Sequence, residues 1–309
     1  MTSSPSGDPR DRRDHVTTVA ALTMTLAVLC MACMDATSKY LVARYPTAFV
    51  VWIRYALQTL VIAAVLAPRT RGALVATRSF PLQMLRSLML VATSLLLVAA
   101  FHAMPLADAT AISFAAPSIV TLLAMAFLGE RMTAPRVAAV VAGFAGVLLI
   151  VRPGTDVFRG AALLPLLAAA TTAAYQVLTR KLAGDDTRAM LFYASAVGAV
   201  LMSFLLPWRG IAHDFPLRDL AAMAGVGLLA IAGHFLFIRA LQLAPASGLA
   251  SITYVQLVFS TLIGFVVFGD FPDGVTLAGM AVILASGLLL TWHERRRAGA
   301  PTLAAASDA

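Results

Sequence analysis

The sequence predicts an all-α integral membrane protein whose ten transmembrane helices form two inverted five-helix repeats. Three observations favour this fold class: an apolar composition, ten apolar segments long enough to cross a bilayer, and a similarity between the two halves of the chain. Of the 309 residues, 60% are hydrophobic and 12% are charged, whereas about a quarter of a soluble domain is charged. A soluble protein of this composition would expose large apolar patches, so lipid is the expected solvent.

Each crossing of a bilayer needs about 20 mostly apolar residues, because a helix that rises about 1.5 Å per residue must span roughly 30 Å of hydrocarbon. In chain order, the ten predicted spans are 17–38, 47–67, 81–101, 106–128, 135–151, 160–179, 189–207, 219–241, 246–268 and 275–292. Two junctions between spans are very short. They contain Pro105 and Pro245, which are expected to end the preceding helices.

The distribution of basic residues predicts the orientation, because cytoplasmic loops keep an excess of Lys and Arg. With the N-terminus inside, the cytoplasmic segments hold fifteen Lys and Arg residues and the opposite loops hold six, while Arg54 and Arg86 fall within spans. We therefore expect a multi-pass protein of the inner (plasma) membrane with both termini in the cytoplasm. Residues 1–16 are expected to form a disordered cytoplasmic tail, and residues 293–309 a cytoplasmic tail that is first basic and then disordered.

The two halves of the chain resemble each other. A shift of 140 residues places Phe127-Leu128-Gly129-Glu130 on Val267-Phe268-Gly269-Asp270. In both copies a long apolar span ends in a glycine and an acid, and one more span follows. We interpret 17–151 and 160–292 as two five-helix repeats. Because five is an odd number, the second repeat enters the membrane upside down, an arrangement that suits alternating access.

A longer pattern identifies a family. It consists of Ala100–Ile112 (AFHAMPLADATAI), Pro117, Leu128-Gly129-Glu130-Arg131, Gly143 and Gly146, with a second-half echo in Ala240–Ala246 and Phe268-Gly269-Asp270. Over about 17–292 the chain resembles the EamA-type permeases of the drug/metabolite transporter superfamily. The second half departs from the family at Gln256-Leu257, where a proline is frequent, and at Asp270, where glutamate is frequent. The resemblance implies ten helices around a central cavity and a substrate such as an amino acid, a vitamin or a nucleoside-like compound.

Polar side chains within the spans mark candidate substrate contacts, because a charge at the centre of a membrane helix costs about 2.5–3.5 kcal/mol. Arg54 lies a third of the way into the second span and could clamp a carboxylate or a phosphate. Extension of the side chain to the lipid headgroups is the alternative, and it is the favoured interpretation of Arg86. The predicted substrate-binding residues are Arg54, Trp52, Tyr175, Gln176, Tyr254 and Gln256; polar contacts between helices are the competing explanation for the tyrosines and glutamines.

Two further residues are predicted to couple transport to protons. His234 is flanked on both sides by long apolar stretches, and imidazole ordinarily titrates near neutral pH. A hydrogen bond between helices explains His234 equally well. Asp35 lies near the end of the first span, where it could pair with Arg54 on the neighbouring span or with Lys39 four residues along the same helix.

The remaining polar motifs are interpreted as structural. Glu130 and Asp270 end the fourth and ninth spans, where an acid opposes the helix macrodipole, so each is expected to bond the start of the next helix. Cys30 and Cys33 have CxxC spacing, but no second pair of cysteines and no nearby histidine completes a metal site. No metal and no cofactor is predicted.

The sequence therefore favours a secondary transporter that moves a small metabolite, with the lipid bilayer as its environment and a proton as the candidate coupling ion; a homodimer is left open. A membrane-embedded enzyme would need clustered His, Asp or Glu residues near the bilayer, and the sequence shows no such cluster. It also contains no Walker-type motif. A non-transporting sensor or scaffold would need a signalling domain, for which the tails are short. The net charge of +8 does not indicate nucleic acid, because the basic residues lie at the ends of apolar runs.

Overall fold

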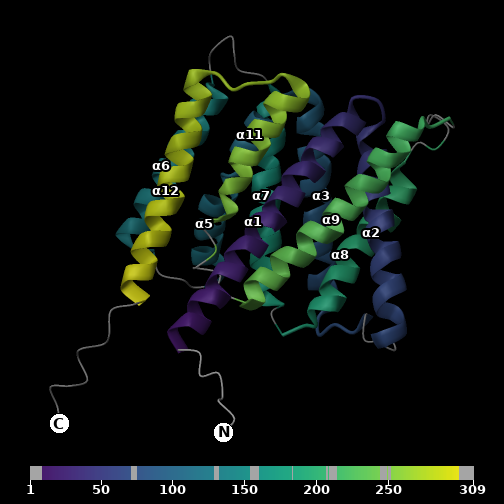
Figure 1. The fold of residues 1–309 in the computed structure, drawn as a ribbon, viewed down its shortest axis with the longest axis horizontal. Coiled ribbons are helices and arrows are strands. Elements are labelled where there is room, and N and C mark those ends of the chain that lie inside the picture. Colours follow the sequence, from purple (N-terminus) through teal and green to yellow (C-terminus); the bar gives the residue numbers. More distant parts are fainter. Residues whose placement is uncertain are drawn as a thin grey trace, which may run out of the picture.

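A computed structural model describes residues 9–70, 75–128, 132–153, 160–182, 184–206, 208, 214–243, 249 and 252–298. All regular secondary structure within these ranges is helical (Figure 1). The elements are α1 (Pro9–Val42), α2 (Thr47–Thr70), α3 (Phe80–Ala103), α4 (Leu106–Ser113), α5 (Ala116–Leu128), α6 (Ala134–Val151), the 3-10 turn η2 (Gly160–Ala162), α7 (Leu163–Lys181), α8 (Thr187–Leu205), α9 (Leu217–Leu243), α11 (Val255–Phe268) and α12 (Gly274–Ala298).

Most of the predicted spans agree with these helices. In the described part of the chain, nine segments are long and apolar enough to cross a membrane, and α11 is a shorter apolar helix. Large apolar side chains such as Phe204, Leu217 and Val266 point outward, which lipid accepts without penalty. The chain is therefore a multi-pass membrane protein.

The ends of the chain and the ninth span differ from expectation. Helix α1 already begins at Pro9 and α12 continues to Ala298, so helix extends into both predicted tails, while residues 1–8 and 299–309 lie outside the described ranges. The ninth span was expected over 246–268, but α11 begins only at Val255. Residues 244–248, 250 and 251, which include Pro245, are outside the described part.

The fourth predicted span is broken near its middle into α4 and α5. The amide nitrogen of Ala115 donates to the carbonyl oxygen of Ile112 at 3.0 Å, so α4 tightens into a last short turn before it stops. Pro117 then stands in the first turn of α5, where the missing N–H of proline costs nothing. Irregular backbone at this depth is tolerated in a membrane protein where it is buried inside the protein or lines a cavity.

Contacts between helix ends show the direction of each helix. We call the membrane surface at which α1 ends the Lys39 face. Lys39 donates to the carbonyl oxygen of Met104, just after α3, and to the carboxylate of Asp270, just after α11. Tyr45, just after α1, donates to Asp219 in the first turn of α9 at 2.7 Å. Helices α1, α3 and α11 therefore end at the Lys39 face, and α9 begins there.

The opposite membrane surface, which we call the Lys181 face, is defined by contacts of the same kind. Thr77, just before α3, donates to Asp185, which lies between α7 and α8. The ammonium nitrogen of Lys181, the last residue of α7, lies 5.6 Å from the ring centroid of Phe127 near the end of α5. Helices α1 and α7, α3 and α9, and α5 and α11 thus run in opposite directions, as inverted repeats require.

The packing of the helices obeys the same two-fold relation. Helix α2 packs on α8 and α6 packs on α12, so these helices contact their own counterparts. Helix α1 packs on α9 and α11, and its counterpart α7 packs on α3 and α5 (Figure 1). The predicted fold class, an all-α membrane protein built from two inverted repeats, is confirmed.

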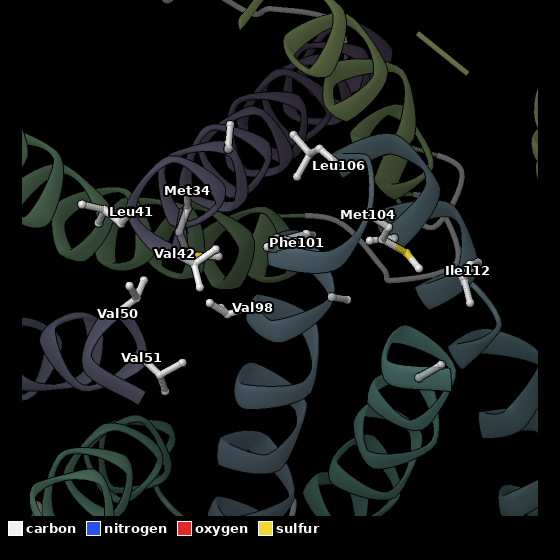
Figure 2. Packing of buried hydrophobic residues seen from close by; sticks show 14 of the residues in the cluster. Met34, Leu41, Val42, Val50, Val51, Val98, Phe101, Met104, Leu106 and Ile112 are labelled. Atoms are coloured by element: carbon white, nitrogen blue, oxygen red, sulfur yellow. The ribbon is translucent and has the colours of Figure 1, made fainter. Parts of the chain in front are cut away.

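A buried apolar cluster holds the first four helices together on the side of the Lys39 face. Figure 2 shows Leu41 and Val42 of α1, Val51 of α2, Phe101 of α3 and Leu106 of α4 in this cluster. All five side chains are almost completely buried. In lipid such contacts are held by van der Waals packing rather than by the hydrophobic effect, so the cluster fixes the positions of the polar residues nearby.

Helices α6 and α12 make their closest contact at two glycines, Gly146 and Gly279. A Cβ atom added at Gly146 would lie 2.8 Å from the carbonyl oxygen of Gly279, and one added at Gly279 would lie 2.7 Å from the carbonyl oxygen of Gly146. Real side chains cannot approach backbone so closely. The two backbones touch because both positions lack a side chain, a common solution in membrane proteins.

We predict that Gly279→Leu destabilises the protein. The new side chain would also meet Ile150, whose Cγ1 lies 2.6 Å from the added Cβ, and overpacking of this kind costs roughly 1–3 kcal/mol. Thermal unfolding of the purified protein in detergent should therefore show a lower midpoint. Gly225→Leu is the matched control, because nothing lies within 4 Å of a Cβ added there. Equal midpoints for the two variants would contradict the close α6–α12 contact.

Candidate functional site

Asp35 is a buried acid in the membrane-spanning part of α1. Its side chain is 5% exposed, and the Nε2 atom of Gln256 donates to its Oδ2 at 3.2 Å. Gln256 lies in the first turn of α11, so the carboxylate also sits near the positive end of a helix dipole. The structure thus brings together two of the predicted site residues, one from each half of the protein.

Arg54 lies on α2 and is partly buried. Its guanidinium group donates to the hydroxyl of Ser94 on α3 and lies 5.0 Å from the ring centroid of Tyr55. Ser94 is in turn hydrogen-bonded to the Tyr55 hydroxyl at 2.7 Å. Arg54 and Asp35 interact electrostatically, but they are farther apart than the 4.0 Å of an ion pair. One of the alternatives left open by the sequence, a direct ion pair between Arg54 and Asp35, is therefore absent from this structure.

His234 lies on α9 and uses one ring nitrogen within its own helix. Its Nδ1 atom is 2.7 Å from the carbonyl oxygen of Ala230, so the proton of this hydrogen bond must sit on Nδ1 and Nε2 is left as an acceptor. The charge of Arg54 acts on the imidazole. The expected hydrogen bond between helices is replaced by this bond within α9.

Phe114 and Tyr254 face each other at the two helix breaks. Their ring centroids are 5.3 Å apart with an interplanar angle of 27°, an offset-stacked geometry that aromatic pairs prefer. Phe114 follows α4 and Tyr254 precedes α11, and the shift of 140 residues that relates the two halves places one on the other. The stacked pair therefore joins equivalent positions of the two repeats.

Three predicted substrate-binding residues lie in other contacts. Trp52 donates through Nε1 to Ser203 on α8 at 2.8 Å and packs edge-on against Trp208. Tyr175 accepts a hydrogen bond from Arg86 at 2.9 Å. Gln176 is exposed on α7. None of these contacts involves Asp35, Arg54 or Gln256, so the structure gathers fewer of the predicted site residues in one place than the sequence suggested.

Arg86 does not extend to the headgroups, which corrects the favoured interpretation of this residue. Its side chain is 3% exposed. It donates to the hydroxyls of Thr179 and Tyr175 and to the carbonyl oxygen of Met190. These partners belong to α7 and α8, so Arg86 joins the first half to the second. Sequence alone could not show this, because the partners are neutral and distant along the chain.

Lys39 and Asp270 form an ion pair that was not expected. Their Nζ and Oδ2 atoms are 3.0 Å apart, and Lys39 also lies 5.2 Å from the ring centroid of Phe268. Asp35 therefore does not pair with Lys39, and Asp270 does not bond the start of α12. Asp273 does so instead, by accepting from the backbone nitrogen of Thr276 at 2.8 Å. The corresponding expectation for Glu130 lies outside the described residues.

A second ion pair at the Lys39 face joins Arg152 to Asp273. Arg152 ends α6 in the left-handed region, with φ of 48°. Its guanidinium group, assisted by the Thr276 backbone N–H, lowers the pKa of Asp273 to about 2. At the same face, the hydrogen bond to Asp219 raises the pKa of Tyr45 to about 12. Both links therefore persist over the whole physiological pH range.

We predict that the Arg152–Asp273 pair adds nothing to the pH dependence of the protein's stability between pH 5 and 8. A carboxyl whose folded pKa is lowered stabilises the protein above its unfolded pKa of about 3.9, and this stabilisation is lost only as the pH falls through the folded value. Unfolding midpoints of wild type and Asp273→Asn, measured from pH 5 to 8, should differ by a constant amount. A difference that changes with pH in this range would contradict the assignment.

The described residues contain no group of three or more His, Cys, Asp or Glu side chains that could hold a metal ion. Cys30 and Cys33 are free thiols in α1. An open groove before α9 is lined by Asp214, Phe215, Pro216 and Leu220, and it includes none of the predicted site residues. The polar group formed by Asp35, Arg54, His234 and Gln256, together with the Phe114–Tyr254 stack, is therefore the candidate site, and we call it the central site.

Many secondary transporters are built from inverted repeats with a polar centre at broken helices, and this chain has that arrangement. The sequence model of the EamA-like transporter family matches residues 18–152 and 159–292. The chain belongs to this family, as its sequence pattern indicated.

Several named relatives are similar to this chain over nearly their whole length. The S-adenosylmethionine uptake transporter of Rickettsia conorii is 26% identical, and the match covers 88% of this chain and 92% of the relative. The pseudopaline exporter CntI of Pseudomonas aeruginosa is 30% identical over 87% of this chain and 95% of its own. The riboflavin transporter of Rhizobium johnstonii is 29% identical over 92% of this chain and 94% of its own length.

A solved structure shows the same fold. It is described only as the crystal structure of a protein, and it superimposes with a TM-score of 0.62 at 21% sequence identity, covering 92% of this chain and 99% of its own. The relatives named above are transporters, whereas this structure supports the fold alone.

Proposed function

We propose that the protein is a secondary transporter that moves a small metabolite across the inner membrane by alternating access. The observation that supports this most strongly is the packing of two inverted halves around a central site whose residues come from both halves. In such a molecule, an exchange of conformation between the two halves moves the opening of the site from one membrane face to the other.

The excess of Lys and Arg in alternate loops favours an orientation with both termini in the cytoplasm. The Lys181 face is then cytoplasmic and the Lys39 face is on the outer side of the inner membrane. In this proposal the two moving units are residues 17–151 and 160–292. No homodimer is needed for the cycle, because one chain contains both halves.

The ion pair between Lys39 and Asp270 is proposed to close the outer side. It ties the end of α1 to the end of α11, and the bond from Lys39 to the carbonyl oxygen of Met104 adds the turn after α3. The equivalent helices at the Lys181 face are α7 and α5, where Lys181 lies over Phe127. Separation of one set of ends while the other set stays together is the motion that alternating access requires.

Within the central site, Arg54, Tyr254 and Gln256 are proposed to contact the substrate. Trp52, Tyr175 and Gln176 lie away from this group and are proposed to line the route to it. Asp35 and His234 are proposed to carry the coupling proton, because a buried carboxylate and a neutral imidazole can each bind one. The relatives are transporters rather than enzymes, and we propose that this chain likewise performs transport and not catalysis.

Flux in reconstituted vesicles tests the proposal. Purified protein in liposomes should accumulate at least one radiolabelled compound from a panel of amino acids, S-adenosylmethionine, riboflavin and nucleosides, and an imposed pH gradient should change the rate. Protein-free liposomes are the control. If the folded protein moves no member of the panel in either direction, with or without the gradient, the proposal fails.

We also predict that Lys39→Ala opens the outer side. In a background with Cys30 and Cys33 replaced by alanine, a cysteine placed at the buried residue Met104 should react slowly with a membrane-impermeant maleimide. Loss of the Lys39–Asp270 link should raise this rate several-fold. Arg44→Ala removes a cation at the same face that bonds to and packs on Tyr40, and it should leave the rate unchanged. Equal rates for Lys39→Ala and the parent protein would contradict the proposed closure.

A further inference from the structure

A buried arginine near the Lys181 face is held by neutral groups alone. Arg86 is the seventh residue of α3, so it lies about 9 Å along the helix from the start of α3. Its side chain is 3% exposed. It donates through Nε to the Thr179 hydroxyl at 2.8 Å, through Nη2 to the Tyr175 hydroxyl at 2.9 Å and through Nη1 to the carbonyl oxygen of Met190 at 3.1 Å. None of these three acceptors carries a charge.

Two acids lie between α7 and α8, the helices that hold Arg86, and both are bonded elsewhere. Asp185 accepts from the backbone nitrogen of Arg78 at 3.1 Å. Asp186 accepts from the backbone nitrogen of Arg188, in the first turn of α8, at 2.7 Å. Within the described part of the chain, no carboxylate forms an ion pair with Arg86. The positive charge of Arg86 is therefore buried without a counter-charge from these residues.

One turn earlier on the same helix, a buried amide lacks hydrogen-bond partners. Gln83 is 0% exposed, and neither its Nε2 nor its Oε1 atom has a partner among the described residues. Both Gln83 and Arg86 belong to the buried face of α3, and residues three apart on a helix are neighbours, with Cβ atoms about 5–6 Å apart. An unpartnered buried amide is destabilising, and in a folded protein it calls for an ion or a water molecule.

The two side chains keep N–H donors for a ligand. A guanidinium group has five N–H groups, and three of those of Arg86 are used in the bonds to Thr179, Tyr175 and Met190, so two remain. The amide of Gln83 adds two more. The first turn of α3, which lies next to Gln83, contributes the positive end of a helix dipole. Donors and charge at this place therefore have the sign that an anion requires.

We propose that a small inorganic anion, such as chloride, binds between Gln83 and Arg86. The anion accepts from Nε2 of Gln83 and from the unused N–H groups of Arg86, and its negative charge compensates the buried guanidinium group. A water molecule beside it donates to Oε1 of Gln83, as buried waters do for polar atoms that lack another partner. Both side chains are almost completely enclosed, which favours an ion of one atom over a lipid head group or a metabolite.

The anion consolidates a contact between the two halves of the protein. Arg86 belongs to α3 in the first repeat, and its partners belong to α7 and α8 in the second. Compensation of its charge removes the main electrostatic cost of this contact. The proposed anion site shares no residue with the central site, and its occupancy is measured without any flux, so it stands or falls independently of the proposed transport function.

Thermal unfolding of the purified protein in detergent tests the inference, with sodium chloride replacing sodium gluconate at constant ionic strength. An ion that binds only the folded state raises the apparent stability, so the unfolding midpoint should rise by several degrees as chloride increases from about 1 to about 300 mM. Gluconate is the reference anion, because it is too large for an enclosed site. In crystals grown with sodium bromide, anomalous scattering should place a bromide ion next to Nε2 of Gln83.

Variants assign the chloride response to this site. Gln83→Leu and Arg86→Met should each unfold at the same midpoint in chloride and in gluconate. Gln58→Leu removes another buried glutamine, on α2, and Arg188→Gln removes an exposed cation at the Lys181 face; both should keep the wild-type response. If Arg86→Met does not fold, Arg86→Lys replaces it. Lysine keeps the charge but lacks the planar fork of donors, so this variant should need several-fold more chloride for the same shift.

The wild-type measurement alone can overturn the inference. Equal midpoints in chloride and gluconate would mean that no anion occupies the site. In that case Gln83→Leu should raise the midpoint equally in both salts, because it removes an unpartnered amide from the interior. A chloride response that survives both Gln83→Leu and the Arg86 variant would place the ion elsewhere and refute the site, and so would a bromide ion found only at other positions.

Discussion

The constraint on which this structure depends is that a chain in lipid must satisfy its own backbone hydrogen bonds. Within the described ranges long helices cross most of the membrane, and they are interrupted at the break between α4 and α5 and at the turn at Tyr254 before α11. At these two points the backbone is irregular, and the rings of Phe114 and Tyr254 stack across them. Irregular backbone is acceptable in a membrane only inside the protein, so the breaks mark its interior. The inverted repeat brings them together, since each occupies the equivalent position of its half.

The placement of the charged side chains follows from the same constraint. Asp35, Arg54 and His234 are expensive inside a bilayer, and each is held by a neutral partner: an amide, a hydroxyl and a backbone carbonyl. Two direct charge pairs of the described residues, Lys39 with Asp270 and Arg152 with Asp273, lie instead at the Lys39 face, where they join helix ends. Direct pairs thus join helix ends at one membrane face, whereas the charged residues at the centre contact neutral partners.

Much of the fold was predictable, because a transmembrane helix is specified by the length and apolarity of one continuous segment and by the Pro and Gly residues at its ends. The break after Phe114 could have been anticipated from Pro117, but the start of α11 could not, because Leu257 takes the equivalent place. The site was predicted less well. Asp35 and Gln256 were both identified, yet their contact joins residues 221 apart in sequence. Ser94 and Phe114 carried no signal, since serines and aromatics are common in spans. The Lys39–Asp270 pair was missed because a nearer acid, Asp35, fits helical spacing equally well.

The most direct test of the account is a measurement of two distances by electron paramagnetic resonance, with spin labels at Arg44 and Phe271 for the Lys39 face and at Ala126 and Arg188 for the Lys181 face. These side chains are exposed, and Cys30 and Cys33 would first be replaced by alanine. Alternating access predicts that a transported compound shifts the two distance distributions in opposite directions, one pair separating as the other approaches. Two distributions that widen together, or that stay fixed while the compound is transported, would contradict the account.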